Sequence, residues 1–218
     1  MSRSADCTPV YNKNDNCVTV GAKDKDRCLP LSCFCETGEL IRNGGFEIPG
    51  FEPGRVFSDW RLGLSTEAIN LVSTTNNVYE GNTAASVQTT ATPVVETKIL
   101  QLRQNVTVTP GCLYRLQFAE RLVALGTVDT FLPTLVASIY YVYQGFEYNL
   151  LSLPIQKPAV DRRYVLHNQE ADLPVPCNVS GIVVQFEFII TDSGGSVWNL
   201  DAVSLRAVSR LSDCCCKE

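Results

Sequence analysis

Several features common in enzymes and membrane proteins are missing from this sequence of 218 residues. It has one histidine, His167, in the polar run YVLHNQEAD that we expect on a surface loop, and no Gly-x-Ser-x-Gly or phosphate-binding Gly-rich motif. No apolar run approaches the roughly 18–20 residues that span a bilayer, and the first residues lack the apolar core of a secretion signal. We therefore expect no enzyme activity, no catalytic residues and no membrane partner.

Basic side chains are also too few for a nucleic-acid-binding protein. The chain carries 18 Lys and Arg against 23 Asp and Glu, which gives a formal net charge of −5 at pH 7. Because a polyanion is held mainly by an excess of Lys and Arg, we expect no nucleic-acid partner. With 45% hydrophobic residues, the chain can bury a substantial core without covalent cross-links.

Cysteine, by contrast, is abundant and unevenly placed. The ten cysteines are Cys7, Cys17, Cys28, Cys33, Cys35, Cys112, Cys177, Cys214, Cys215 and Cys216. Neighbouring Cα atoms lie about 3.8 Å apart, which is too close for an ordinary disulfide. At least two of the three contiguous C-terminal cysteines therefore need partners elsewhere or stay reduced. The spacing of the cysteines in both terminal segments, with no histidine nearby, matches zinc sites poorly.

The cysteine positions divide the chain into a Cys-rich N-terminal arm (1–38), a middle domain (39–209) and a Cys-rich tail (210–218). Within the arm, CVTV (17–20) is the one strand-like run. In the middle domain, runs such as LYRLQF (113–118) and GIVVQFEFII (181–190) alternate apolar and polar residues and are separated by turn-forming segments. Many short strands with regular turns predict an all-β fold, a two-sheet antiparallel jelly-roll sandwich.

Four motifs in the middle domain resemble those of jelly-roll carbohydrate-binding modules of the galactose-binding-like type. They are ELIRNGGFE (39–47), YEGNTAASV (79–87), QNVTVTPGCLYRLQF (104–118) and VWNLDAVSL (197–205). The likeness is greatest to the jelly-roll domain that precedes collagen-like repeats in surface proteins of spore-forming Firmicutes. Here no Gly-X-Y repeat follows, and Ala202 replaces the second Asp of the closing motif. The arm and the tail lie outside the resemblance.

The resemblance implies a structural calcium ion. In that family, an Asp of the closing strand and a Glu of the opening turn bind Ca²⁺, and the matching residues here are Asp201 and Glu47. Oxygen ligands of this kind suit a hard cation. Alternation with Val203 and Leu205 predicts that Asp201 faces the core, where an isolated carboxylate is costly. In the alternative, Asp201 accepts backbone hydrogen bonds and Glu47 is solvated.

Aromatic residues gather in IYYVYQGFEY (139–148), which predicts a hairpin with Gly145 in its turn. Its tyrosines are candidates for a platform that stacks against a sugar ring beside a polar sheet face. The candidate glycan-binding residues are Tyr140, Tyr141, Tyr143, Gln185 and Glu187. In the alternative, these rings form cross-strand pairs and core. A glycoside hydrolase would need a suitably spaced carboxylate pair, and the sequence points to none.

Cysteines at both ends of a self-sufficient domain favour bonds between subunits. We expect the ten cysteines to form intermolecular disulfides that join copies of the chain head to tail into a self-assembling fibre or layer. Some pairing within the chain stays open, among Cys7 to Cys35, between Cys112 and Cys177, or of either with the arm.

The cysteines indicate an oxidising destination, and no export signal is visible. Both features fit a structural protein of the bacterial endospore surface, such as the exosporium, that is exposed when the mother cell lyses. Other spore-coat proteins are then further partners. The alternative function is a carbohydrate-binding module or adhesin that binds glycans on an aromatic sheet face.

Overall fold

The computed structural model describes residues 9–11, 17–20, 28–30, 35, 37–52, 55–126 and 131–211. Side chains are described between residues 35 and 208. In this part of the chain every regular element is a strand, and no helix is long and apolar enough to cross a membrane.

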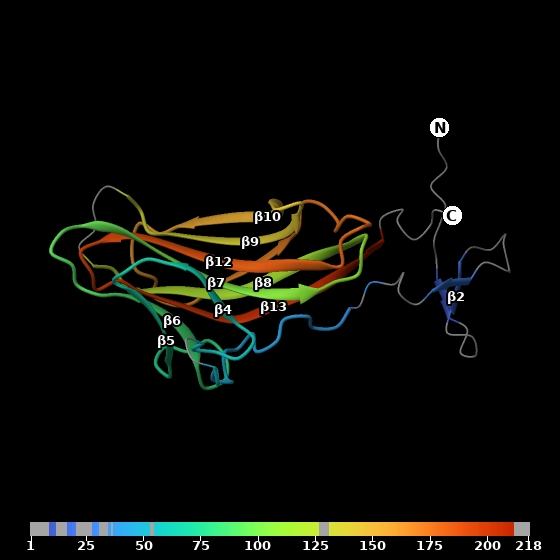
Figure 1. The fold of residues 1–218 in the computed structure, drawn as a ribbon. Coiled ribbons are helices and arrows are strands. Elements are labelled where there is room, and N and C mark those ends of the chain that lie inside the picture. The colour runs from blue at the N-terminus through green and yellow to red at the C-terminus, as the bar shows by residue number, and fades with distance from the viewer. Residues whose placement is uncertain are drawn as a thin grey trace.

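Two five-stranded antiparallel sheets form the body, as the sequence predicts (Figure 1). We call the sheet with the order β10–β9–β12–β7–β4 the front sheet, and the sheet with the order β11–β8–β13–β6–β5 the back sheet. The front strands are β4 (Arg61–Ser65), β7 (Glu96–Thr107), β9 (Thr134–Tyr143), β10 (Phe146–Gln156) and β12 (Gly181–Asp192). The back strands are β5 (Ile69–Thr74), β6 (Ala84–Thr89), β8 (Cys112–Ala124), β11 (Val165–Glu170) and β13 (Val197–Leu211). A separate sheet joins β1 (Pro9–Tyr11), β2 (Cys17–Val20) and β3 (Cys28–Pro30).

The core lies between the two sheets and follows from the alternation of side chains along each strand. On β12, Phe186 and Phe188 are fully buried, whereas Gln185 and Glu187 face outward and are only partly buried. Trp198 of β13 meets Phe188 from the opposite sheet, with ring centroids 5.9 Å apart. Each such ring, removed from water, contributes about 2–3 kcal/mol to folding. The apolar pattern of the sequence therefore predicts both the fold class and the core.

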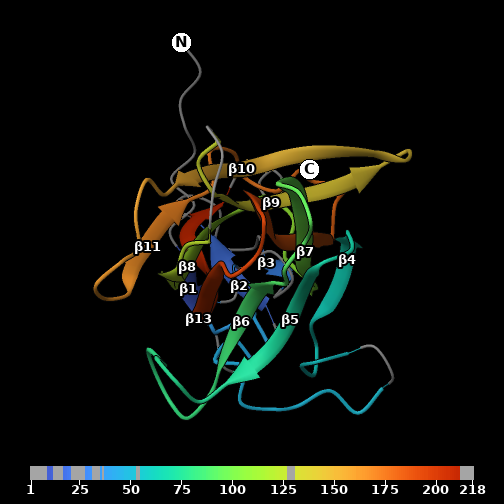
Figure 2. The same ribbon diagram turned by 90° about the vertical axis from the view of Figure 1, so that its left-hand side faces the viewer.

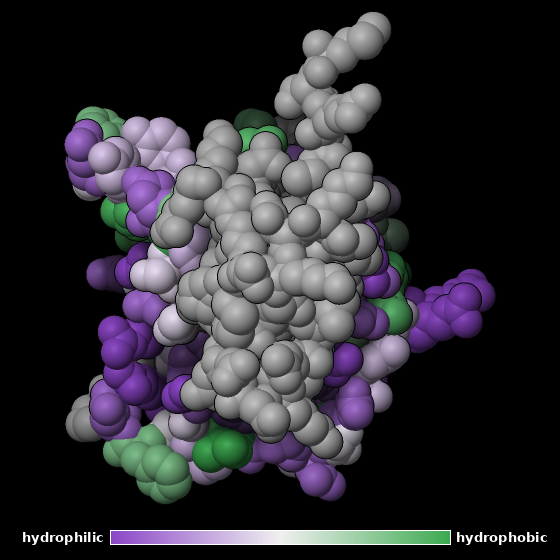
Figure 3. Space-filling model, turned by 90° about the vertical axis from the view of Figure 1, so that its right-hand side faces the viewer, coloured by the Kyte–Doolittle hydropathy of each residue, from purple (hydrophilic) through white to green (hydrophobic). Residues whose placement is uncertain are grey.

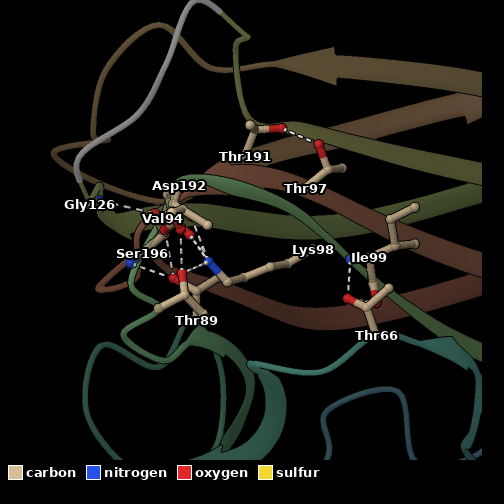
Figure 4. A network of polar contacts seen from close by, with 11 residues as sticks. Thr66, Thr89, Val94, Thr97, Lys98, Ile99, Gly126, Thr191, Asp192 and Ser196 are labelled. Atoms are coloured by element: carbon tan, nitrogen blue, oxygen red, sulfur yellow. Dashed lines mark hydrogen bonds and ion pairs between the residues drawn. The ribbon is translucent and has the colours of Figure 1, made fainter.

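A buried ion pair closes one end of the sandwich (Figure 4). Lys98 of β7 and Asp192 of β12 are fully buried, with 2.9 Å between Nζ and Oδ1. The Thr89 hydroxyl of the back sheet donates to Asp192 Oδ2 at 2.6 Å. Burial acts to raise the pKa of Asp192, but hydrogen bonds from Ser196, Thr89 and Lys98 outweigh it and lower the pKa. The pair thus links both sheets, and removing either partner alone would leave an uncompensated buried charge.

A disulfide between Cys35 and Cys112 closes the other end, with the two Cα atoms 5.7 Å apart. The prediction that these two cysteines join subunits is therefore wrong. The reason lies in how the chain enters the body: Cys35 lies at the start of β8, and the chain then runs beside β13, where Leu40 N donates to Leu205 O at 3.0 Å. Cys112 thus pairs with the incoming arm of its own chain. Cys177 is disulfide-bonded as well.

The arm enters and the tail leaves at the same end of the body. β13 pairs with β8 as far as Leu211, which lies opposite Cys112, and Cys112 is bonded to Cys35. Cys35 and Leu211 are thus the described residues at which the arm and the tail meet the body. The side chains of Cys7, Cys17, Cys28, Cys33, Cys214, Cys215 and Cys216 lie outside the described residues.

Breaking the internal disulfide is expected to lower the free energy of unfolding by about 3–4 kcal/mol, because a cross-link over 77 residues restricts the unfolded chain. Cys35→Ala is the suitable variant, since Cys35 is only partly buried and Cys112 keeps its place in the core. Urea unfolding of wild type and variant measures the difference. Equal unfolding midpoints would show that this bond does not stabilise the body.

Candidate functional site

Asp201, one of the two predicted calcium ligands, is fully buried on β13 and holds the loop before β6. Its Oδ2 accepts hydrogen bonds from the backbone N–H groups of Tyr79 at 2.9 Å and Glu80 at 3.1 Å. Its Oδ1 accepts one from Ala202 N at 2.7 Å. Burial raises the pKa of Asp201, the three N–H groups partly oppose this, and the nearby charge of Glu47 raises it further.

Glu47, the second predicted ligand, is exposed and binds the same loop from outside. Its Oε1 accepts hydrogen bonds from Asn82 N at 2.7 Å and Thr83 N at 3.0 Å, and these bonds lower the pKa of Glu47. The loop approaches so closely that a Cβ at Gly81 would lie 2.2 Å from Glu47 Oε1. Gly81 also has a φ of +74°, which suits glycine.

N–H groups, rather than a gap for a cation, therefore face both carboxylates. The described side chains also include no group of three or more His, Cys, Asp or Glu that could hold a metal. Glu47 and Asp201 thus both bind the same loop through its backbone N–H groups. They form a carboxylate clasp that holds residues 79–83.

The β9–β10 hairpin runs across the top of the molecule, and its tip projects beyond the neighbouring strands (Figure 2). The pairing of β12 with β9 ends where Val183 lies opposite Tyr140, so the residues beyond form a two-stranded ribbon. Gln144 and Gly145 make the turn with φ values of 52° and 82°. Positive φ at both central residues is typical of a type I′ hairpin turn. The sequence predicts this turn and the role of Gly145 in it.

Four aromatic rings share one face of this ribbon. Tyr141 lies directly opposite Tyr148, and Tyr143 lies opposite Phe146. The first two rings are stacked, with centroids 5.2 Å apart and planes 14° apart. The exposed fractions are 44% for Tyr143, 67% for Phe146 and 43% for Tyr148. We call these four residues the aromatic ladder. Seen from the end of the molecule, the hairpin stands out at a corner of the surface (Figure 3).

The predicted glycan-binding residues are divided between two faces. Tyr141 and Tyr143 belong to the ladder, because they lie on the same side of β9 as the buried Ile139. Tyr140 lies on the outer face of the front sheet with Gln185, and its hydroxyl donates to Gln185 Oε1 at 3.3 Å. Glu187 lies two residues farther along β12. The structure therefore does not combine the tyrosine pair with Gln185 and Glu187 in one site.

Tyr140 itself cannot serve as a stacking platform. Only 3% of the residue is exposed, and burial raises the pKa of its hydroxyl, with Arg103 opposing and Glu147 adding to the shift. On the same outer face, Glu187 Oε1 accepts a hydrogen bond from Gln101 Nε2 at 2.7 Å. The outer face thus offers hydrogen-bonding groups without an exposed ring from Tyr140, whereas on this hairpin the exposed rings belong to the ladder.

A second charged cluster lies around Glu120, which sequence reasoning does not identify. Glu120 is fully buried on β8 and accepts from Trp198 Nε1 at 2.7 Å, while Lys157 Nζ lies 2.7 Å from its other oxygen. His167 lies 3.1 Å from that oxygen and stacks on Phe118, so the prediction of a surface loop is wrong because the residue belongs to β11. Glu120 thus joins Trp198 of β13, His167 of β11 and Lys157 at one point.

No protein-family model and no curated protein matches this chain. Among solved structures, a CBM61 module in complex with β-1,4-galactotriose aligns with 78% of this chain and 99% of its own, at a TM-score of 0.52 and 18% identity. The enzymatically active domain of tailspike protein 4 of bacteriophage CBA120 aligns with 78% of this chain and 21% of its own, at 0.53 and 16%. A CBM4 module aligns with 77% of this chain and 99% of its own, at 0.47 and 15%.

At such low identity, the likeness shows the fold alone. The chain is a jelly-roll sandwich of the type found in carbohydrate-binding modules. The matched structures include binding modules and parts of enzymes, so the likeness does not by itself assign an activity.

The carboxylate clasp predicts stability that does not depend on calcium. Addition of Ca²⁺ or of a chelator is expected to leave the melting temperature unchanged, because backbone N–H groups already satisfy Asp201. Asp201→Asn should lower the free energy of unfolding by about 3 kcal/mol, since it sets an amide against buried donors. Glu47→Gln, at the exposed carboxylate, should cost less. A calcium-dependent rise in melting temperature would establish the metal site and contradict the clasp.

Proposed function

We propose that this protein is a carbohydrate-binding module whose aromatic ladder stacks against sugar rings. One observation carries the proposal: the ladder presents Tyr143, Phe146 and Tyr148 to solvent from a ribbon that has no third strand. Large apolar side chains gathered on one exposed face usually mark a binding surface. Here they are fixed by strand pairing rather than by a mobile loop, so little order has to be gained on binding.

The chemistry of the ladder suits a saccharide. A pyranose ring has one face made largely of C–H groups, which packs against an aromatic ring, and hydroxyl groups around its edge. Tyrosine offers an apolar ring and a polar hydroxyl with few rotatable bonds. The hairpin carries no Lys or Arg, and its polar residues Glu147 and Asn149 lie on the face opposite the ladder. An anionic membrane surface or a nucleic acid is therefore a poor partner for it.

The shared fold supports this proposal without deciding the ligand. The CBM61 module that aligns with this chain was solved with β-1,4-galactotriose. A soluble β-1,4-galactan is therefore a reasonable first probe for this protein.

The bacterial endospore surface remains the proposed location, with spore-coat proteins as neighbours, and it rests on the sequence resemblance. A disulfide-cross-linked homopolymer has less support as the main function, because Cys35 and Cys112 are bonded to each other within the chain. Binding of surface glycans by a single stable body requires no polymer.

The double variant Tyr143→Ala/Phe146→Ala tests the proposal. It removes one rung of the ladder and leaves the stacked Tyr141–Tyr148 pair and the turn in place. Binding to a panel of soluble glycans that includes β-1,4-galactan, measured by affinity electrophoresis and calorimetry, should weaken at least tenfold, roughly the 1.4 kcal/mol expected from two lost ring contacts.

Val142→Thr is the matched control, since it lies on the same hairpin but on its other face and is also exposed. It should bind like wild type. A wild-type protein that binds no glycan of the panel, or a control that loses as much affinity as the ladder variant, would contradict the proposed function.

A further inference from the structure

A groove of about 380 Å³ opens beside β7, toward the edge of the front sheet that lies farther from the hairpin. Arg42, Asp59, Asn105 and Thr107 are among the residues that line it. Asn105 and Thr107 follow each other at a spacing of two on β7, so they share its outer face. The groove is therefore continuous with the outer surface of the front sheet.

Two arginines lie opposite each other on the outer face of the front sheet, next to Asn105. Arg61 of β4 lies directly opposite Arg103 of β7, at the position next to Asn105 on the same face. Like charges directly opposite each other on a sheet destabilise it. Room for the Arg103 guanidinium depends on Gly63, where a Cβ would come within 3.1 Å of Arg103 Cζ. The Arg103 guanidinium therefore lies against Gly63 of β4, the strand that also carries Arg61.

The two carboxylates that line the groove, Glu39 and Asp59, have partners within the protein. Arg42, Arg61 and Arg103, by contrast, form no ion pair among the described residues. Glu39 accepts hydrogen bonds from Ile41 N and Leu205 N and also pairs with Arg206. Asp59 accepts a hydrogen bond from the Ser58 hydroxyl at 2.8 Å.

No acidic side chain among the described residues forms an ion pair with the arginines at the groove, Arg42, Arg61 and Arg103. Arg103 instead contacts the Tyr140 hydroxyl. Glu187 of the same outer face is hydrogen-bonded to Gln101.

We propose that Arg42, Arg61 and Arg103 form a binding site for an anionic saccharide, one that carries carboxylate or sulfate groups. A guanidinium binds such oxyanions through paired N–H donors. The Asn105 amide and Thr107 hydroxyl supply partners for sugar hydroxyls beside the charged group. This site lies apart from the aromatic ladder, so it adds a second, charge-selective surface to the proposed glycan-binding function and does not depend on the first.

Titrations with polygalacturonate, dextran sulfate and uncharged dextran test the site. Wild type should bind at least one of the two charged polymers at least tenfold more tightly than dextran, and more weakly as salt is raised. Preference for polygalacturonate identifies a uronate ligand, and preference for dextran sulfate identifies a sulfated one. Arg61→Gln/Arg103→Gln should weaken that binding at least tenfold, and adding Arg42→Gln should weaken it further.

Arg162→Gln/Arg163→Gln is the matched control, because it removes the same charge from an exposed loop elsewhere. It should bind the charged polymers like wild type, and so should Tyr143→Ala/Phe146→Ala, whose loss of neutral-galactan binding tests only the aromatic ladder. The anionic site is refuted if the control loses as much affinity as Arg61→Gln/Arg103→Gln, or if wild type binds dextran as tightly as both charged polymers.

Discussion

The constraint on which the rest depends is that β9 is longer than its pairing with β12. That pairing ends at Tyr140, and β9 continues to Tyr143 with β10 as its single neighbour. Because side chains alternate along a strand, the face that buries Ile139 in the core carries Tyr141 and Tyr143 beyond it. The same strand thus contributes to the core at one end and exposes aromatic rings at the other.

The exposed rings of the ladder are not needed to stabilise the fold, because the sandwich to which the hairpin belongs stabilises it. Isolated two-stranded ribbons are marginally stable in water, but this one is anchored in a sandwich closed at both ends. The Lys98–Asp192 pair links the sheets at one end, and the Cys35–Cys112 bond ties the arm to the other. The hairpin and the groove beside β7 lie toward opposite edges of the front sheet in this body.

Sequence alternation predicts the sandwich, the hairpin turn at Gly145 and the burial of Asp201, because each depends on neighbours within one strand. It does not predict what depends on contacts between distant segments. The Cys35–Cys112 pairing needs the path of residues 35–40 beside β13, and the Arg61–Arg103 pair needs the register of β4 against β7. The separation of Tyr143 from Gln185 is an intermediate case. Odd and even positions alternate between the two faces of β9 and β12, but the face that each side chain occupies follows only once the orientation of both strands is known.

An NMR titration with a soluble β-1,4-galactan oligosaccharide tests the central claim most directly, because it reports which rings meet the ligand. If the ladder is the binding surface, the ring resonances of Tyr143, Phe146 and Tyr148 shift on titration, and those of the buried Tyr114 stay in place. Saturable binding with no change at these three rings, and shifts confined to another part of the surface, would contradict the account.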